Sequence, residues 1–502
     1  MDLREFLRRL EEAGQLQAID EEVDWNLQAG AICTMSNRTG GPAIHFKKVK
    51  GYPDGYSLAG SLFAGPSNVK FLPERPWSRQ ALALDLAADT DYETFIATLL
   101  ERCVEPIPPI RVSVGPCKEN ILREGDGDIY SLPIPYLHAG DGGRYGNAGV
   151  VLTRDPEAGW QYCGWHRWMV ADGQSLVIAL QPLLTPFLPG TLSAIHQKYK
   201  AANQPMPVAI VLGGDPAYLL AAAMFLRPGT EVTAVAGGLR REPIALVKAE
   251  TNDLLVPADA EIVIEGAVSP TVSVPEGPFP QYIHRTSPTP GPLCHITAVT
   301  HRSSPIFPFI AEGDKFSDSL SIISTFVSLE LTRFAKRDLG VPVRWLNCPV
   351  EAMMALCAVS MRIIQAGWPA RLTRFLFAHP LAGWFDKVLI LDETVEGVDW
   401  LDMVRDLTEK ANPEKNWHWL QGTSSFVQAY SNSDAKLNPI ATKMYINATF
   451  PSWWEQSQLP KRIAFETSFP PAIQERTVAR WKELGLPGEP VVRKPAPTPS
   501  PL

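Results

Sequence analysis

A short stretch in the middle of the chain combines a restricted backbone with side chains that could handle protons. The segment "VPEGPFPQYIHR" (residues 274–285) holds Glu276 inside a Pro-Glu-Gly-Pro turn. Such a turn allows few backbone conformations, as a carboxylate of fixed orientation requires. Further along stands Gln281, an amide that can hydrogen-bond but cannot act as a general acid near neutral pH.

A second candidate is "YCGWHRWMV" (residues 162–170), where Arg167 lies in an apolar, strand-like run after His166. A buried arginine needs a carboxylate partner, because an isolated buried charge is very costly. The pattern fits a structural ion pair. It equally fits a carboxylate-binding arginine in a pocket lined by Trp165 and Trp168, and this segment alone leaves both readings open.

Two glycine-rich segments could bring backbone close to a phosphate. "GDGGRYGNAG" (140–149) is not GxGxxG and no helical pattern follows it, so a turn between strands is the simpler interpretation. "AGGLRRE" (236–242) could clamp a phosphate with two arginines or form a solvated hairpin. Neither segment identifies a nucleotide site.

The elements that must position these residues follow from periodicity. The N-terminal "MDLREFLRRLEEAG" predicts an amphipathic helix capped by Asp2, with Glu5 completing a capping box. Strand-like runs between turns dominate about residues 111–300 and indicate a barrel or sandwich. From about residue 315 helices are predicted in "SDSLSIISTFVSLELTRFAKRDLG", "PVEAMMALCAVSMRIIQAG", "VDWLDMVRDLTEKANP" and "PPAIQERTVARWKELGL", with strands in "KVLILD" and "TKMYINATF".

Composition narrows the class of protein. The formal net charge of −8 gives no basic field for nucleic acid, and no apolar run is long enough to span a membrane. The N-terminus is charged and has no apolar signal core, and the seven cysteines include no CxxC pair, which indicates reduced thiols in a cytoplasmic protein. The nine histidines form no metal-binding motif.

Four stretches together resemble the UbiD family of reversible decarboxylases: "LPIPYLHAGDGGRY", "PVAIVLGGDPA", "ETNDLLVPADAEIVIEG" and "PEGPF". The resemblance runs from about residue 5 to 485. Within the family, "EEVDWNLQAGAI", "PCKENIL" and "NPEKNWHWLQGTSS" are similar to the phenylphosphate-carboxylase-like branch.

The resemblance implies an α/β (α+β) fold with an N-terminal mixed α/β domain, a central split β-barrel that binds flavin, and a C-terminal α/β oligomerisation domain. We place these domains at residues 1–110, 111–312 and 313–440, followed by a return strand and C-terminal helix (441–486) and a disordered proline-rich tail (487–502). The implied cofactor is prenylated FMN, supplied by a flavin prenyltransferase, which accepts the electrons left as CO₂ departs from an aromatic or α,β-unsaturated acid.

The family site is an Arg-Glu-Glu network. By resemblance Arg167 and Glu276 match its arginine and first glutamate, and we expect them to form a direct ion pair facing a pocket between the barrel and the C-terminal domain. The resemblance also places Trp165 and His166 beside the cofactor, and Lys443 near its phosphate.

The chain departs from the family pattern at the remaining positions. Gln281 replaces the proton-donating glutamate, and His166 or His284 could take over that proton, although each also fits an ordinary packed or surface histidine. The family binds a divalent ion (manganese) through Asn, His and Glu, which fall here on Tyr162, Thr191 and Ala245. These are poor or absent ligands, so we expect the metal site to be lost.

Two functions follow from these matches and departures. One is a UbiD-like carboxy-lyase with an altered proton-donor and metal site, acting as a homo-oligomer. The other is a non-catalytic subunit that partners an active UbiD-like paralogue in a larger complex. A nicotinamide or P-loop enzyme is excluded, since neither glycine fingerprint is present.

Overall fold

The computed structural model describes two compact units. It covers the chain except for residues 66–74, 181–190, 283, 314–316, 364–366, 394, 396–397, 399, 426–439, 452, 461–462, 488–489, 491 and 493–502. The first unit comprises Met1–Gly65, Pro76–Thr90 and Thr94–Phe326, and the second comprises Pro66–Arg75, Asp91–Glu93 and Val327–Leu502. The five-part division predicted from the sequence is finer than this and stays a prediction.

The first helix follows its sequence pattern closely. α1 (Leu3–Glu12) begins after Asp2, whose carboxylate accepts a hydrogen bond from the backbone N–H of Glu5 at 2.9 Å. The carboxylate of Glu5 pairs with Arg8 and Arg9, so it supports the helix through ion pairs in place of the predicted capping box. The apolar stripe is buried, as the spacing predicts: Leu3, Phe6, Leu7 and Leu10.

A four-stranded sheet near the N-terminus has the order β1-β2-β3-β18. Its strands are β1 (Leu16–Val23), β2 (Ala43–Val49), β3 (Ser57–Gly60) and β18 (Ile306–Phe309). The helices in this part of the chain are α2 (Gln28–Thr39), α3 (Ser78–Ala83) and α4 (Tyr92–Cys103). The last strand comes from far along the chain, so the N-terminal segment is integrated into the first unit.

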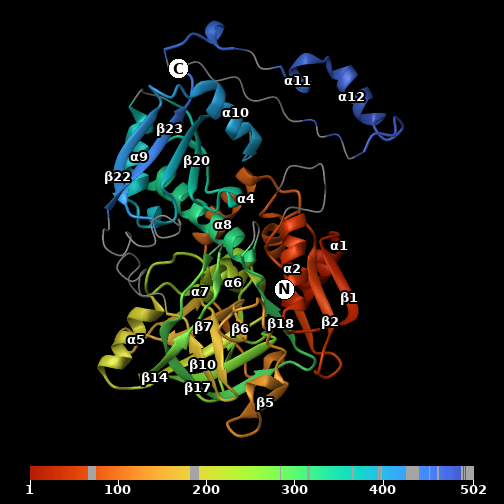
Figure 1. Cartoon of the computed structure of the whole chain (residues 1–502), viewed down its shortest axis with the longest axis vertical. Coiled ribbons are helices and arrows are strands. Elements are labelled where there is room, and N and C mark those ends of the chain that lie inside the picture. The colour runs from red at the N-terminus through yellow and green to blue at the C-terminus, as the bar shows by residue number, and fades with distance from the viewer. Residues whose placement is uncertain are drawn as a thin grey trace. The chain divides into compact units, whose positions relative to one another are not determined.

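A nine-stranded sheet forms the centre of the first unit (Figure 1), with the order β6-β9-β10-β17-β14-β11-β7-β8 and β5 paired to β17. The strands are β5 (Asn120–Arg123), β6 (Tyr145–Gly146), β7 (Gly149–Arg154), β8 (Gln161–Trp165), β9 (Trp168–Asp172), β10 (Ser175–Ile178), β11 (Met206–Leu212), β14 (Ile262–Glu276) and β17 (Thr289–His301). β14 and β17 pair from Ile262↔His301 to Glu276↔Thr289. Glu276 therefore lies at the far end of the longest strand pair.

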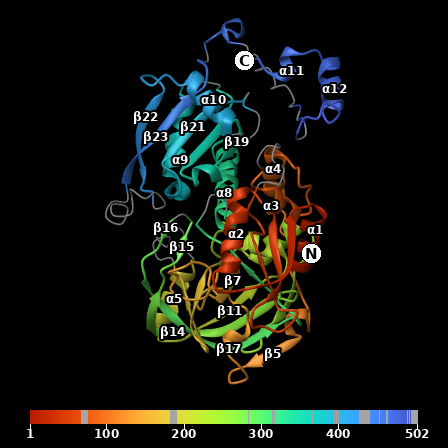
Figure 2. The same cartoon turned by 45° about the vertical axis from the view of Figure 1, so that its right-hand side comes forward.

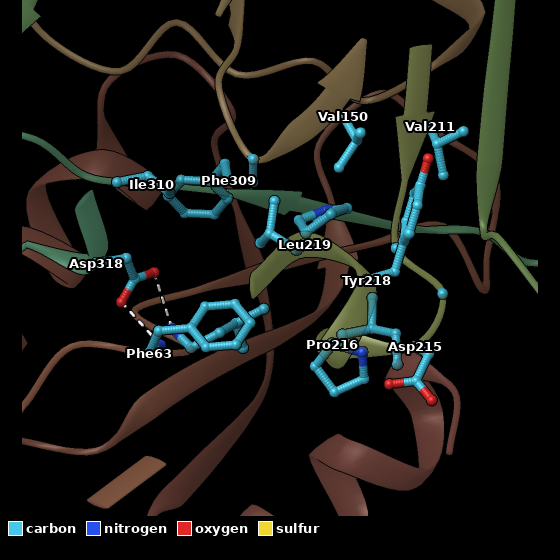
Figure 3. A pocket seen from close by; sticks show the side chains of 16 residues that line it. Phe63, Val150, Val211, Asp215, Pro216, Tyr218, Leu219, Phe309, Ile310 and Asp318 are labelled. Atoms are coloured by element: carbon cyan, nitrogen blue, oxygen red, sulfur yellow. Dashed lines mark hydrogen bonds between the residues drawn. The ribbon is translucent and has the colours of Figure 1, made fainter. Parts of the chain in front are cut away.

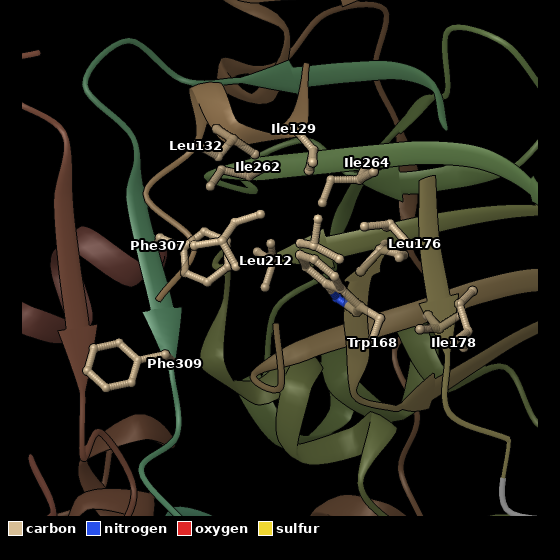
Figure 4. Close-up of a cluster of buried hydrophobic side chains, with 14 of the residues drawn as sticks. Ile129, Leu132, Trp168, Leu176, Ile178, Leu212, Ile262, Ile264, Phe307 and Phe309 are labelled. Atoms are coloured by element: carbon tan, nitrogen blue, oxygen red, sulfur yellow. The ribbon is translucent and has the colours of Figure 1, made fainter. Parts of the chain in front are cut away.

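The core of this sheet is built from branched and aromatic side chains (Figure 4). Trp168 is fully buried, and its ring centroid lies 6.4 Å from that of Phe307. Leu212, Ile262 and Ile264 from β11 and β14 belong to the same cluster. Trp168 is thus a core residue and does not line a pocket beside Arg167, contrary to the sequence interpretation, because the chain turns between β8 and β9.

Smaller elements complete the first unit. Helices α5 (Leu192–Ala201) and α6 (Pro216–Ala222) pack against strands of the large sheet, and α7 (Val232–Arg240) packs on α6. Short strands form two further sheets, from β4 (Ile110–Arg111), β12 (Ala245–Lys248) and β13 (Leu255–Pro257), and from β15 (Pro280–Gln281) and β16 (His284–Arg285). Residues 236–240 lie in helix α7, which Arg241 caps, so the hairpin, one of the two interpretations of the segment 236–242, is wrong.

The second unit contains a five-stranded sheet of order β19-β20-β21-β23-β22 (Figure 2). Its strands are β19 (Val343–Asn347), β20 (Leu356–Met361), β21 (Lys387–Asp392), β22 (Trp417–Thr423) and β23 (Ile440–Ala448). Helices α9 (Trp368–Ala378) and α10 (Trp400–Lys410) pack against β22 and β23, and the predictions of β21, β23 and α10 are confirmed. Helix α8 (Asp318–Arg333) is also confirmed and crosses the boundary between the units.

One prediction in the second unit is wrong. The segment 349–367 reads as an amphipathic helix, but it forms a short 3₁₀ turn (Val350–Ala352) followed by strand β20. β20 is buried on both faces between β19 and β21, so its apolar run lacks the alternation that identifies a strand.

Other predictions have mixed outcomes. Near the C-terminus α11 (Phe465–Ser468) precedes α12 (Pro471–Ala479), the last predicted helix. The predicted disordered tail falls mostly outside the described residues. All seven cysteines are free thiols. Among the residues that the structure describes, no helix is both long and apolar enough to cross a bilayer.

Candidate active site

Arg167 and Glu276 form the predicted ion pair within the first unit. Nε of Arg167 lies 2.9 Å from Oε1 of Glu276, and Nη2 lies 2.9 Å from Oε2. The side chains are only 12% and 3% exposed. Two parallel charge-assisted hydrogen bonds fix both groups in one orientation.

Two further side chains complete this arrangement, which we call the clamp: Arg167, Glu276, Tyr145 and Gln281. Nη1 of Arg167 donates to Oε1 of Gln281 at 3.1 Å, and the Tyr145 hydroxyl donates to Oε1 of Glu276 at 3.0 Å. A guanidinium only donates, so Gln281 must present its carbonyl oxygen to it. Burial and the neighbouring Glu276 carboxylate raise the pKa of Tyr145, which keeps its phenol protonated.

The glycine-rich loop before β7 supports the turn that carries Glu276. The backbone N–H of Gly142 donates to the carbonyl of Pro278 at 2.8 Å. A Cβ at position 142 would lie 2.2 Å from the carbonyl oxygen of Gly277, so only glycine fits this close approach. The Phe279 ring centroid lies 4.6 Å from Cζ of Arg167 and covers the guanidinium. The loop interpreted as a plain turn thus contributes Tyr145 to the clamp, and its Gly142 supports the turn that carries Glu276.

A second group, the hydroxyl cluster, consists of Tyr162, His166 and Thr191. The Tyr162 hydroxyl lies 2.8 Å from Nε2 of His166 and also interacts with the backbone N–H of Leu192 at the start of α5. Thr191 caps α5 through its hydroxyl, 3.4 Å from the N–H of Ala194. Tyr162 and Thr191 are therefore both at the N-terminus of α5, where backbone N–H groups favour an anion.

The hydroxyl cluster is electrically neutral at neutral pH. Burial lowers the pKa of His166 to about 4. Burial also raises the pKa of Tyr162, so neither the phenol nor the imidazole carries a charge. His284, the other histidine considered as a proton donor, is exposed on β16.

The remaining predicted site residues are not part of either group. Trp165 is half-buried, and its Nε1 donates to the carbonyl of Asn147 at 2.6 Å. Ala245 lies on β12, where it pairs with Ile110 of β4.

Lys443 lies in the second unit and is 1% exposed. Its ammonium donates to the backbone carbonyls of Ala382 and Phe385, and burial lowers its pKa to about 7. Its role near the cofactor phosphate stays a prediction.

The donor set does not fit a divalent ion. Within the described residues, no group of three or more His, Cys, Asp or Glu side chains is arranged to hold a metal. Glu231, just before α7, acts electrostatically on Cys163, whose side chain points to the opposite face of β8 from that of Tyr162. The phenol of Tyr162 and the hydroxyl of Thr191 are poor ligands for a hard cation.

The arginines after α6 do not form a phosphate clamp. Arg240 is buried, and its guanidinium pairs with Asp215 at 2.7 Å and with Asp85 at 2.6 Å. Arg241 pairs with Glu105 at 2.7 Å. Both charges are therefore used in structural ion pairs.

A cavity beside the start of α6 has about 30 Å³ of space for water, enough for about two molecules. Figure 3 shows Val150, Leu219 and Phe309 around this cavity. The Asp318 carboxylate at its edge accepts a hydrogen bond from the backbone N–H of Phe63. It is too small for a flavin or an aromatic acid, and it belongs to the core.

Sequence reasoning missed several residues at the clamp. Tyr145 ends a stretch that carries the family resemblance, so that stretch contained a usable signal. Tyr282 directly follows Gln281 in the stretch 274–285, so its position was a usable signal as well. Glu312 had none, because it approaches Arg167 only through the fold.

Comparison with family models covers most of the chain. The N-terminal, Rift-related and C-terminal domains of 3-octaprenyl-4-hydroxybenzoate carboxy-lyase (UbiD) match residues 7–99, 110–315 and 321–448. Among curated proteins, the chain is 28% identical over 500 residues to pyrrole-2-carboxylic acid decarboxylase of Pseudomonas aeruginosa (97% of this chain, 98% of the relative). It is 27% identical over 504 residues to ferulic acid decarboxylase 1 of Saccharomyces cerevisiae (97% and 98%).

Solved structures agree with these matches. The UbiD-class enzyme HmfF from Pelotomaculum thermopropionicum, in complex with FMN, superposes with a TM-score of 0.82 at 26% identity, over 96% of this chain and 100% of the other. Vanillic acid decarboxylase of Sedimentibacter hydroxybenzoicus in its open form gives a TM-score of 0.81 at 26% identity, over 96% and 98%.

Proposed function

Because this chain belongs to the UbiD family of carboxy-lyases, we propose that it decarboxylates an aromatic or α,β-unsaturated carboxylic acid with prenylated FMN. The observation that carries the proposal is the buried clamp around Arg167. The named relatives act on pyrrole-2-carboxylic, ferulic and vanillic acids, which all bear the carboxyl group on an unsaturated carbon framework.

The residues present fit the flavin. An anion such as its phosphate suits the N-terminus of α5, beside Tyr162 and Thr191. His166 lies beside this helix end, bonded to the Tyr162 hydroxyl through Nε2 and to the backbone of Ala179. We assign these three residues to the cofactor. When bound, prenylated FMN supplies the electron sink for decarboxylation.

The clamp positions the carboxylate of the substrate. Arg167 has five N–H donors, and three of them serve Glu276 and Gln281. The other two remain for a substrate carboxylate. Glu276 and Phe279 hold the guanidinium in place, so binding requires little reorganisation.

We propose that no divalent metal takes part. The phenol of Tyr162 and the hydroxyl of Thr191 are poor ligands, and Ala245 has none. The helix N-terminus and neutral donors of the hydroxyl cluster then bind the phosphate directly. We also propose that the protein acts as a homo-oligomer.

Co-expression with a flavin prenyltransferase tests the function. We expect a purified protein with the absorption of bound modified flavin, which releases CO₂ from at least one of pyrrole-2-carboxylic, ferulic or vanillic acid. A colourless protein that co-purifies with a second UbiD-like chain would contradict the proposal and support the non-catalytic subunit.

A further inference from the structure

The reaction needs a proton donor, and the residues first considered cannot serve. Gln281 is an amide whose oxygen faces Arg167. With a pKa of about 4, His166 is neutral at neutral pH, and His284 is exposed. The Tyr145 phenol already donates to Glu276. The family position for the acid is therefore unfilled, although the product carbon must still receive a proton.

Glu312 is a buried carboxyl group between β18 and α8, and it is 6% exposed. The hydroxyl of Ser319 bonds to its Oε2, and the side chain of Ser317 bonds to the same carboxyl. Ser317 and Ser319 are themselves 2.9 Å apart. This pair of hydroxyls can bond to the carboxyl in either protonation state, because each both donates and accepts.

Electrostatic interactions with Arg167 and with Tyr282, the neighbour of Gln281, link Glu312 to the clamp. Tyr282 interacts with Gln281 through its side chain and with Glu312 electrostatically. Arg167 is close enough to act on the Glu312 carboxyl. Nε2 of the His138 side chain lies 3.1 Å from the backbone carbonyl oxygen of Glu312. This bond connects the Glu312 segment to the loop that precedes Tyr145.

We propose that the Glu312 carboxylic acid donates the proton to the product carbon, in place of the side chain at position 281. The assignment rests on the proposed decarboxylation. When the carbon–carbon bond breaks, CO₂ leaves, and the electron pair of that bond becomes the new C–H bond with the proton of Glu312. Glu312 is left as a carboxylate, which Arg167, Ser317 and Ser319 stabilise until water returns a proton.

The surroundings of Glu312 keep it in the acid form at neutral pH. Burial, with the nearby Asp318 carboxylate, raises the pKa of Glu312 to about 8, while the two serines and Arg167 oppose the shift. Of the residues that the structure describes, Tyr282, whose pKa is raised, also interacts with the Glu312 carboxyl, and His138 bonds to the Glu312 backbone carbonyl. The acid is present below this pKa, so turnover must fall as pH rises through about 8.

Glu312→Gln tests the assignment in the flavin-loaded protein. The measurement is exchange of the product's ring or vinyl hydrogen with deuterated water, with the flavin spectrum recorded for every variant. We expect exchange to fall by about 10²–10⁴-fold, the usual contribution of a general acid. The control is Glu124→Gln, an exposed carboxylate (64%) that should leave exchange unchanged.

The double variant Glu312→Gln/Gln281→Glu sharpens the test, because it places an acid back at the family position. We expect it to recover part of the lost exchange. Flavin-bound Glu312→Gln that exchanges as fast as the wild type would overturn the proposal. If Glu312→Gln fails to fold, the wild-type pH profile decides: a rate that does not fall between about pH 7 and 9.5 overturns the assignment.

Failure of the proposed function gives a different result. Wild-type protein that binds flavin but releases no CO₂ and exchanges no hydrogen would overturn decarboxylation itself, and the role of Glu312 with it. Active wild type with unchanged Glu312→Gln would overturn only the assignment of Glu312.

Discussion

The clamp and the hydroxyl cluster are adjacent in the chain, because Arg167 belongs to the clamp and His166 to the hydroxyl cluster. They differ in charge: the clamp contains ionised groups and the cluster contains neutral ones. The clamp buries a guanidinium and a carboxylate that satisfy each other. The hydroxyl cluster keeps a phenol and an imidazole neutral. A paired charge cannot lose one partner without leaving the other buried and unpaired. Removing a neutral donor leaves no buried charge behind, so it costs less free energy.

This difference in charge between the clamp and the hydroxyl cluster corresponds to the residue types expected from the family resemblance: the charged pair matches it, and the metal-site positions do not. Arg167 and Glu276 depend on each other for burial, because each neutralises the charge of the other. The positions expected to hold a metal carry Tyr162 and Thr191, which satisfy their own hydrogen bonds without an ion. Position 281 lies between these cases, because an amide still accepts from Arg167 but no longer supplies a proton.

Arg167→Ala should have the largest effect, because it removes the substrate contact and leaves Glu276 buried without its partner. We expect CO₂ release to fall by about 10²–10³-fold or more. We expect the free energy of unfolding to fall by about 3–5 kcal/mol. Turnover and denaturant unfolding measure the two effects. Arg405→Ala, which breaks an exposed ion pair with Asp402, is the control. Equal turnover in the two variants would place the chemistry elsewhere.

Tyr145→Phe should have an intermediate effect. It removes one hydrogen bond to the Glu276 carboxylate, and a bond to a charged group contributes about 1.5–3 kcal/mol. We expect turnover to fall by about tenfold or more as Glu276 shifts. Tyr199→Phe is matched, since its hydroxyl donates to the carbonyl of Arg154 at 3.0 Å, outside the clamp. The idea fails if both phenylalanine variants turn over equally.

Tyr162→Phe should cost stability more modestly. It removes the 2.8 Å bond to His166, an uncharged pair that contributes about 1 kcal/mol. We expect the melting temperature to fall by about 2–4 °C. Calorimetry of the protein without added substrate is the measurement. A fall as large as that of Arg167→Ala would show that the cluster carries charge after all.

Removal of divalent metal by a chelator should have the smallest effect on flavin content and turnover. If the hydroxyl cluster needs no ion, dialysis against EDTA leaves flavin content and turnover unchanged. Elemental analysis should find less than one manganese ion in ten chains, far below stoichiometric occupancy. Stoichiometric manganese that survives dialysis would show that the cluster binds metal.

The sequence by itself predicted much of the fold and three of the four clamp residues, Arg167, Glu276 and Gln281. Leu3, Phe6, Leu7 and Leu10 predict α1 because their spacing matches one face of a helix, and that face is buried. The apolar run around Arg167 required a carboxylate partner, and the family resemblance identified Glu276 as that partner. The helix pattern is a local constraint, whereas the choice of Glu276 came from the resemblance.

The tertiary structure alone decided what surrounds that pair. Strand β20 was predicted as a helix because burial on both faces removes the alternation of a strand. Tyr145 and Glu312 reach the clamp from segments 131 residues before Glu276 and 36 after it, counted from their positions in the chain. No local pattern encodes such an approach. Likewise, the burial that keeps Glu312 protonated is a property of packing, because desolvation depends on every element that covers the carboxyl group.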